Sequence, residues 1–281
     1  MLLELHEKIT IPSLLNNAEA WDLLISDYRE LEQIEISSLK YLFNLPTRTP
    51  TPGIIFALGT LYTEIRIHKK QLIFLHRILT RDVNHWTSQA LKSLQVLNIG
   101  WYKEIINTLQ KCELQQDFEE IKKIPEAAWK AQVTKATEKR NRQKLLDESH
   151  KKEGDMIVPK RKTQSIVRLL ENTNYSRAPI NEILSLSKND CKTLIISRFG
   201  MLECGANYKG TSSGDCLICD RVDDEEHRLN HCVKYRDTNF YDEEEKTPFK
   251  NIYSDNCSVV RVILKKIQTV WNTHTGGGSM S

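Results

Sequence analysis

Apolar residues recur at helical spacing through most of this 281-residue sequence, in runs that proline and glycine interrupt. This pattern favours a helical fold, because a strand needs strict alternation of apolar and polar residues, which is rare here. Proline breaks a helix since it lacks the amide hydrogen that a helix interior requires. The predicted helices cover residues 26–42, 54–79, 101–121, 127–150, 166–170 and 188–201.

The breaks between these helices divide the sequence into five regions. Residues 1–124 form a helical region, 125–165 a basic linker or helix, and 166–215 a shorter helical region. Residues 216–235 hold a compact group of cysteine and histidine residues, and 236–281 form an acidic and then flexible tail with a glycine-rich end. We therefore predict a mostly α fold followed by a small C-terminal module.

Charge is divided unevenly along the chain, although the net charge is only +3. Residues 122–168 contain 14 Lys or Arg against 6 Asp or Glu, a local net of +8. Residues 220–246 contain 5 Lys or Arg against 10 Asp or Glu, a local net of −5. A basic segment attracts polyanions such as nucleic acid and an acidic segment repels them, so the middle of the chain is the candidate binding region.

The C-terminal cysteines follow the pattern C-x2-C-x7-H-x4-C, formed by Cys216, Cys219, His227 and Cys232. Zinc prefers four sulfur or nitrogen ligands in a tetrahedron, and a two-residue spacer lets two cysteines turn back onto one ion. The sequence therefore predicts a Cys3His zinc knuckle. With all four positions taken by protein ligands, the metal would be structural, because no position is left for an activated water.

Two alternatives remain open at this site. The four residues can cluster in the sequence by chance, with Cys216 and Cys219 merely buried. His231 could also take the place of Cys232 as fourth ligand, although the loop between Cys219 and His227 is too short for the common two-cysteine, two-histidine finger. The other cysteines are predicted to be core or incidental residues: Cys112, Cys191, Cys204 and Cys257.

No apolar run approaches the length of a membrane span, and charged residues follow Met1 too soon for a signal peptide. We therefore expect an intracellular protein, where thiols stay reduced and disulfides are rare. No membrane partner is expected.

Several short motifs, taken in order, resemble the C-terminal part of the polyprotein of non-LTR (LINE-type) retrotransposons, downstream of the polymerase palm. Residues 11–21, IPSLLNNAEAW, are similar to the stretch that opens this region in the family. Residues 45–50, LPTRTP, followed by Ala57-Leu58-Gly59, resemble its LP-x-x-TP and ELG segment, with Ala57 in place of glutamate. Arg66 and residues 75–79, LHRIL, match the next helix, and the knuckle falls at the family's cysteine-rich motif.

This resemblance implies a helical thumb and connector that grips template and primer, and a zinc knuckle that handles RNA or target DNA. It also implies a reverse transcriptase palm as partner, and a cytoplasmic and nuclear location. The expected function is non-catalytic binding of RNA or DNA within a reverse transcriptase. The alternative is a stand-alone, zinc-stabilised protein-interaction module derived from a transposon.

We expect no enzymatic activity from this chain alone. A polymerase needs metal-binding carboxylates in a Y-x-D-D turn, and the nearest match, residues 221–224, is RVDD and lies between the predicted zinc ligands. The E-x-K fragment at residues 244–246 lacks the companion Pro-Asp of a restriction-like nuclease.

The predicted nucleic-acid contacts are cations, which neutralise phosphates and release counterions, and one aromatic ring that can stack on an unpaired base. They are Trp129, Lys130, Lys135, Lys139, Arg140, Arg142, Lys144, Lys160, Arg161, Lys162 and Lys209. The alternative is a solvated helix face with Trp129 packed against the preceding helices. RNA and DNA are not distinguished.

Overall fold

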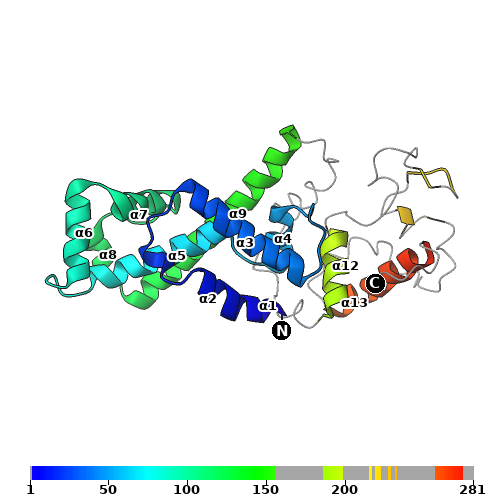
Figure 1. Ribbon diagram of the computed structural model, residues 1–281, viewed down its shortest axis with the longest axis horizontal. Coiled ribbons are helices and arrows are strands. Elements are labelled where there is room, and N and C mark those ends of the chain that lie inside the picture. Colours follow the sequence, from blue (N-terminus) through cyan, green and yellow to red (C-terminus); the bar gives the residue numbers. More distant parts are fainter. Residues whose placement is uncertain are drawn as a thin grey trace. The chain divides into compact units, whose positions relative to one another are not determined.

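The computed structural model describes residues 2–155, 186–198, 215–216, 219–222, 227–228, 232 and 257–274. These residues are mostly helical, as predicted, and no strand occurs among them (Figure 1). The chain forms two compact units. The first contains Met1–Leu39 and Thr60–Asp147, and the second contains Lys40–Gly59 and Glu148–Ser281. None of the described helices combines the length and apolarity needed to cross a membrane.

Most of the described helices belong to the first unit. They are α1 Leu2–Leu5, η1 His6–Thr10, α2 Ile11–Leu14, η2 Ala18–Ala20, α3 Ile25–Leu42, α5 Thr63–Leu79, α6 Trp86–Leu97, α7 Gly100–Lys111, α8 Phe118–Lys123 and α9 Glu126–Asp155. The last residues of α3 and of α9 continue into the second unit. Helix α5 contacts η2, α6, α7 and α8, so it is the central element of the first unit.

Helix α9 runs antiparallel to α5 and is bonded to it at several levels. Near the C-terminal end of α5, His76 Nε2 lies 2.7 Å from the carbonyl oxygen of Ile124, just before α9 begins. In the middle, the indole Nε1 of Trp129 donates to the carbonyl oxygen of Leu72 at 2.8 Å. At the N-terminal end, the Tyr62 N–H donates to Asn141 Oδ1 at 3.0 Å. Residues 126–147, the first part of the predicted basic segment, therefore belong to the first unit, and the rest of the segment belongs to the second.

The side chain of Asn141 accepts a backbone hydrogen bond at the N-terminal end of α5. The first amide groups of a helix have no partner within the helix, and a buried side chain must supply one. Asn141 is 2% exposed and accepts from Tyr62, the residue before α5. Lys144 adds an ion pair to Glu64, Nζ to Oε2 2.8 Å, and its ammonium lies 4.4 Å from the centre of the Tyr62 ring.

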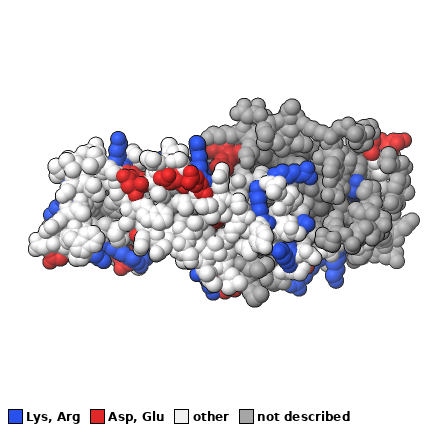
Figure 2. All heavy atoms as spheres, viewed as in Figure 1, with Lys and Arg blue, Asp and Glu red and all other residues white. Residues whose placement is uncertain are grey.

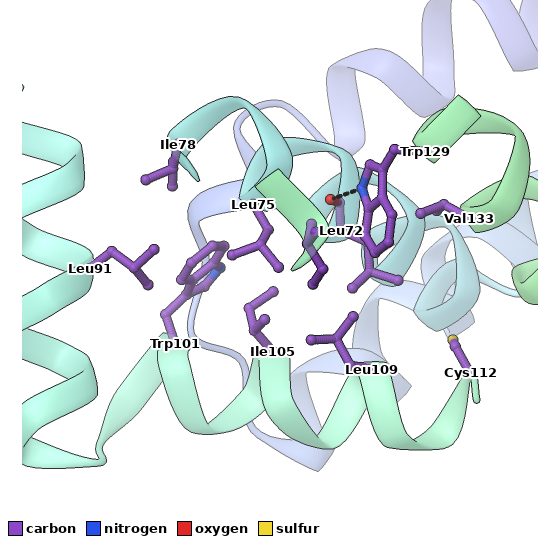
Figure 3. Packing of buried hydrophobic residues seen from close by; sticks show 11 residues of the cluster. Leu72, Leu75, Ile78, Leu91, Trp101, Ile105, Leu109, Cys112, Trp129 and Val133 are labelled. Atoms are coloured by element: carbon purple, nitrogen blue, oxygen red, sulfur yellow. Dashed lines mark hydrogen bonds between the residues drawn. The ribbon is translucent and has the colours of Figure 1, made fainter. Parts of the chain in front are cut away.

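The core of the first unit lies between α5, α6, α7 and α9. Figure 3 shows Trp101, Ile105 and Leu109 of α7 facing α5, with the Trp129 ring beside Leu72. The cluster is completed by Leu75, Ile78, Leu91, Cys112, Ile121 and Val133. Burial of this apolar area is the main favourable contribution to the folding free energy of the unit, at roughly 25 cal/mol per Å².

A second apolar cluster joins the N-terminal segments to α5. Ile11, Leu15 and Ala18 are buried against Ile67. Arg66, the residue before Ile67 in α5, donates to Glu7 in η1 at 2.5 and 2.9 Å. A two-bond guanidinium–carboxylate pair fixes orientation as well as distance. Arg66 therefore links η1 to α5.

Two of the predicted helices are interrupted. Residues 54–79 form α4 Thr51–Leu58 and α5, because Gly59 adopts φ 60°, a left-handed conformation that ends α4 and that glycine tolerates best. Residues 101–121 form α7 and α8, separated at Cys112–Asp117, where Glu113 has φ 55°. Helix α6 was not predicted, because its cap is His85 rather than one of the usual capping residues.

The described helices of the second unit are α4, α12 Lys188–Arg198 and α13 Cys257–His274. Helix α12 contacts both α4 and α13, and the Gln268 amide donates to Asp190 at 2.8 Å. Helix α13 corrects the flexible tail predicted for residues 236–281, since Ile263, Leu264 and Ile267 are buried. The predicted helix at 166–170 lies outside the described residues.

The burial of Trp129 leads to a stability prediction. Replacing a buried Trp by Ala costs about 3–5 kcal/mol, and Trp129 is fully buried and hydrogen-bonded. We expect Trp129→Ala to lower the free energy of unfolding, measured by urea denaturation, by that amount. Trp86→Ala is the matched control, because Trp86 is 72% exposed, and should change it by less than about 0.5 kcal/mol. Equal effects of the two changes would contradict this packing.

His68 gives the first unit a dependence on pH. Its ring is 3% exposed and lies 5.6 Å from the Tyr28 ring, edge to face. Burial lowers the pKa of His68 to about 4, and Glu64 opposes this shift. As the pH falls, His68 therefore gains a proton near pH 6.5 in the unfolded chain but only near pH 4 in the folded chain.

The stabilisation that neutral His68 provides is complete above pH 6.5 and is lost as the pH falls toward 4. We expect a loss on the order of 3 kcal/mol across this window, measured as urea unfolding free energy. A His68→Gln variant, which cannot titrate, should lose correspondingly less. The same acid dependence in both proteins would exclude His68 as the cause.

Candidate metal centre

Four side chains of the second unit converge on one point: Cys216, Cys219, His227 and Cys232. Their ligand atoms all lie within 4.8 Å of one another. The Sγ atom of Cys219 lies 3.6 Å from that of Cys216, 4.0 Å from that of Cys232 and 3.1 Å from His227 Nε2. The sulfurs of Cys216 and Cys232 are 3.8 Å apart. These four are the residues that the sequence pattern predicts as ligands.

A tight turn brings the first two cysteines together. The Asp220 N–H donates to the carbonyl oxygen of Cys216 at 2.9 Å, and the Cys216 N–H donates to that of Arg221 at 2.6 Å. A single antiparallel bridge pairs Asp215 with Val222 on the outer side. Asp220 has φ 51°, a left-handed conformation that aspartate adopts more readily than most residues. The backbone therefore folds back immediately after the second cysteine.

A wide helical turn supplies the other two side chains. The Cys232 N–H donates to the carbonyl oxygen of His227 at 2.7 Å, five residues back, as in a π-helix. This turn sets His227 and Cys232 on one side of the backbone. His231, the alternative fourth ligand, lies outside the described residues, whereas the Cys232 sulfur is within the cluster.

The cluster is shielded from solvent. Cys216 is 8% exposed, Cys232 3% and His227 4%, and Cys219 is half-buried. Three thiols and an imidazole, held this close, can bind a metal ion once the thiols lose their protons. The protein supplies four donors, which is the number that a tetrahedral metal ion takes.

The remaining described cysteines have a different environment. Cys112 and Cys191 are buried, and burial raises the pKa of both thiols, that of Cys191 to about 11. None of the five described cysteines forms a disulfide. A thiol that stays protonated at neutral pH is a poor metal ligand and nucleophile, as expected for a core residue.

The structure removes two residues from the predicted nucleic-acid surface of α9. Trp129 is fully buried with its Nε1 bonded to Leu72, so its ring cannot stack on a base. The Lys144 side chain is 18% exposed, and its ammonium pairs with Glu64 and with Glu32, at 2.8 and 3.4 Å. Both predicted contacts instead join α9 to the core.

Other cations of α9 are paired with carboxylates on the surface. Lys130 Nζ lies 2.6 Å from Glu126, and Lys139 pairs with Glu113. Lys135 is exposed, and Arg140 and Arg142 are half-buried. On the face shown in Figure 2, acidic side chains lie among the basic ones, so the cations do not form one continuous stripe there. The other predicted contacts lie outside the described residues: Lys160, Arg161, Lys162 and Lys209.

Comparisons with protein-family models, curated proteins and solved structures find no match to this chain.

Proposed function

We propose that the Cys3His cluster binds one Zn²⁺ ion and forms a zinc knuckle. Zinc–sulfur bonds of about 2.3 Å at tetrahedral angles separate the sulfurs by about 3.8 Å. The three sulfur–sulfur distances of 3.6, 3.8 and 4.0 Å fit this spacing. Zinc also suits a mixed thiolate and imidazole set, which magnesium and calcium do not.

We propose further that the chain is a non-catalytic, nucleic-acid-binding part of a retrotransposon reverse transcriptase, acting on template RNA or target DNA. The observation that carries this proposal is the convergence of the four predicted ligands. The order of the N-terminal motifs that resemble the non-LTR polyprotein supports it, as does the basic segment before the knuckle. The closed ligand set agrees with a structural role for the metal and leaves the chemistry to other domains.

One observation favours the alternative, a zinc-stabilised protein-interaction module. Large apolar side chains lie exposed on and beside α6: Trp86 is 72% exposed, Val96 84% and Leu97 63%. Exposed apolar groups that gather on one element are typical of protein contact surfaces. Pairing of Lys130, Lys139 and Lys144 with carboxylates also reduces the field that would attract a polyanion.

The metal proposal predicts about one zinc per chain by elemental analysis of the purified protein. Cys216→Ser and Cys219→Ser should each reduce this content strongly, because loss of one of four ligands removes much of the binding energy. A chelator should make three further thiols reactive in the wild type. Cys112→Ser is the matched control, since this buried cysteine lies outside the cluster. Full zinc content in both ligand variants would eliminate the site.

The nucleic-acid proposal predicts salt-dependent binding. Each phosphate neutralised on a single strand contributes about −0.7 to the slope of log K against log salt, so three or four contacts give roughly −2 to −3. The measurement is a fluorescence anisotropy titration of labelled RNA and DNA oligomers at several salt concentrations. No binding at low salt, or a slope near zero, would favour the protein-interaction function.

A further inference from the structure

A cleft of about 350 Å³ opens in the first unit between the C-terminal end of α5 and helices α6, α7 and α8. Its size falls within the range of sites for small ligands, about 300–1,000 Å³. None of the individual nucleic-acid contacts predicted from the sequence lines this cleft. All of its walls come from the first unit.

The floor of the cleft is apolar and aromatic. Ile78 and Leu91 are both 5% exposed and line it. Beside them, the rings of Tyr102 and Phe118 meet edge to face, with centres 5.8 Å apart. Both rings are half-buried, so part of each remains accessible. Such a floor suits a flat apolar group, and aromatic rings stack on nucleic-acid bases without regard to sequence.

The rim carries three cations: Arg81, Lys92 and Lys122. All three are exposed, and none forms an ion pair with a residue of the described ranges. The guanidinium of Arg81 lies 3.4 Å from His85 Nε2 instead. This distinguishes the rim from α9, where Lys130, Lys139 and Lys144 are paired with carboxylates.

Two carboxylates also line the cleft, Asp117 and Glu119. The Asp117 side chain accepts the Glu119 N–H at 2.9 Å and caps α8, so it is already engaged. Glu119 is exposed and opposes an anion. The lining charge remains positive, with three cations against two carboxylates. The amide side chains of Gln95 and Gln116 can bond to the polar edge of a base.

We propose that this cleft holds one unpaired base of a single-stranded nucleic acid, with Arg81, Lys92 and Lys122 contacting the flanking phosphates. This inference rests on the proposed nucleic-acid-binding function and identifies where the strand lies. It assigns the stacking role expected for Trp129 to the accessible rings of Tyr102 and Phe118. RNA and DNA share the chemistry that the cleft recognises.

The first test is photo-crosslinking of the full chain. Uridine and thymidine oligomers of equal length, carrying one 4-thio base, are bound at low salt and irradiated, and the linked peptides are identified by mass spectrometry. We expect linkage to peptides containing Tyr102 or Phe118. Comparison of the two oligomers shows whether RNA or DNA is preferred.

The second test measures affinity and salt dependence of a Lys92→Gln/Lys122→Gln double variant. Removing two phosphate contacts should weaken binding about tenfold and reduce the magnitude of the salt slope by about 1.4, near 0.7 for each contact. The control is Lys123→Gln, which removes one positive charge from α8 at a position outside the cleft lining, where Lys123 pairs with Glu120. Thermal unfolding checks that all variants remain folded.

Different results would overturn the proposed cleft site and the proposed nucleic-acid-binding function. Linkage confined to other peptides, with wild-type affinity in the double variant, would overturn the cleft and leave the nucleic-acid function intact. A loss of affinity in Lys135→Gln as large as that in the double variant would argue for α9 instead of the cleft. Absence of binding by the wild-type chain to either oligomer would overturn both proposals.

Discussion

The antiparallel pairing of α9 with α5 is the constraint on which the first unit depends. Trp129 packs over the middle of α5, while Asn141 and Lys144 satisfy its N-terminal end. A buried helix start without such a partner would leave amide groups unsatisfied, at a cost of about 1–3 kcal/mol each. The same contacts bury the Trp129 ring completely and pair the Lys144 ammonium with the carboxylates of Glu32 and Glu64.

The Cys3His cluster is organised on a different principle. Short-range backbone hydrogen bonds, from Cys216 to Arg221 and from Cys232 to His227, place four ligand atoms within 4.8 Å. The two turns are local, so the side chains can be brought together with little help from a large core. A small module of this kind gains its folding energy chiefly from the metal it binds. This is consistent with the proposed role of zinc as a structural ion.

The distribution of ion pairs bears on the proposed nucleic-acid-binding site. Counting charges along the sequence singles out α9, yet Lys130, Lys139 and Lys144 all have carboxylate partners. Arg81, Lys92 and Lys122 are far apart in the sequence. They line one cleft because the end of α5 lies near α6 and α8 in the fold. Cations without carboxylate partners attract phosphate more strongly, since no bond must first be given up.

Spacing along the sequence predicts the helical class, the positions of α3, α9 and α12, and the four residues of the Cys3His cluster. Each of these follows from spacing within a short segment, through helical periodicity or through the two turns that orient neighbouring cysteines. Tertiary structure decided the interruption after Gly59, the presence of α13 in place of a flexible tail, and the environments of Trp129 and Lys144. Those depend on which partner each side chain meets, because an amphipathic tryptophan or lysine can serve a core or a surface equally well.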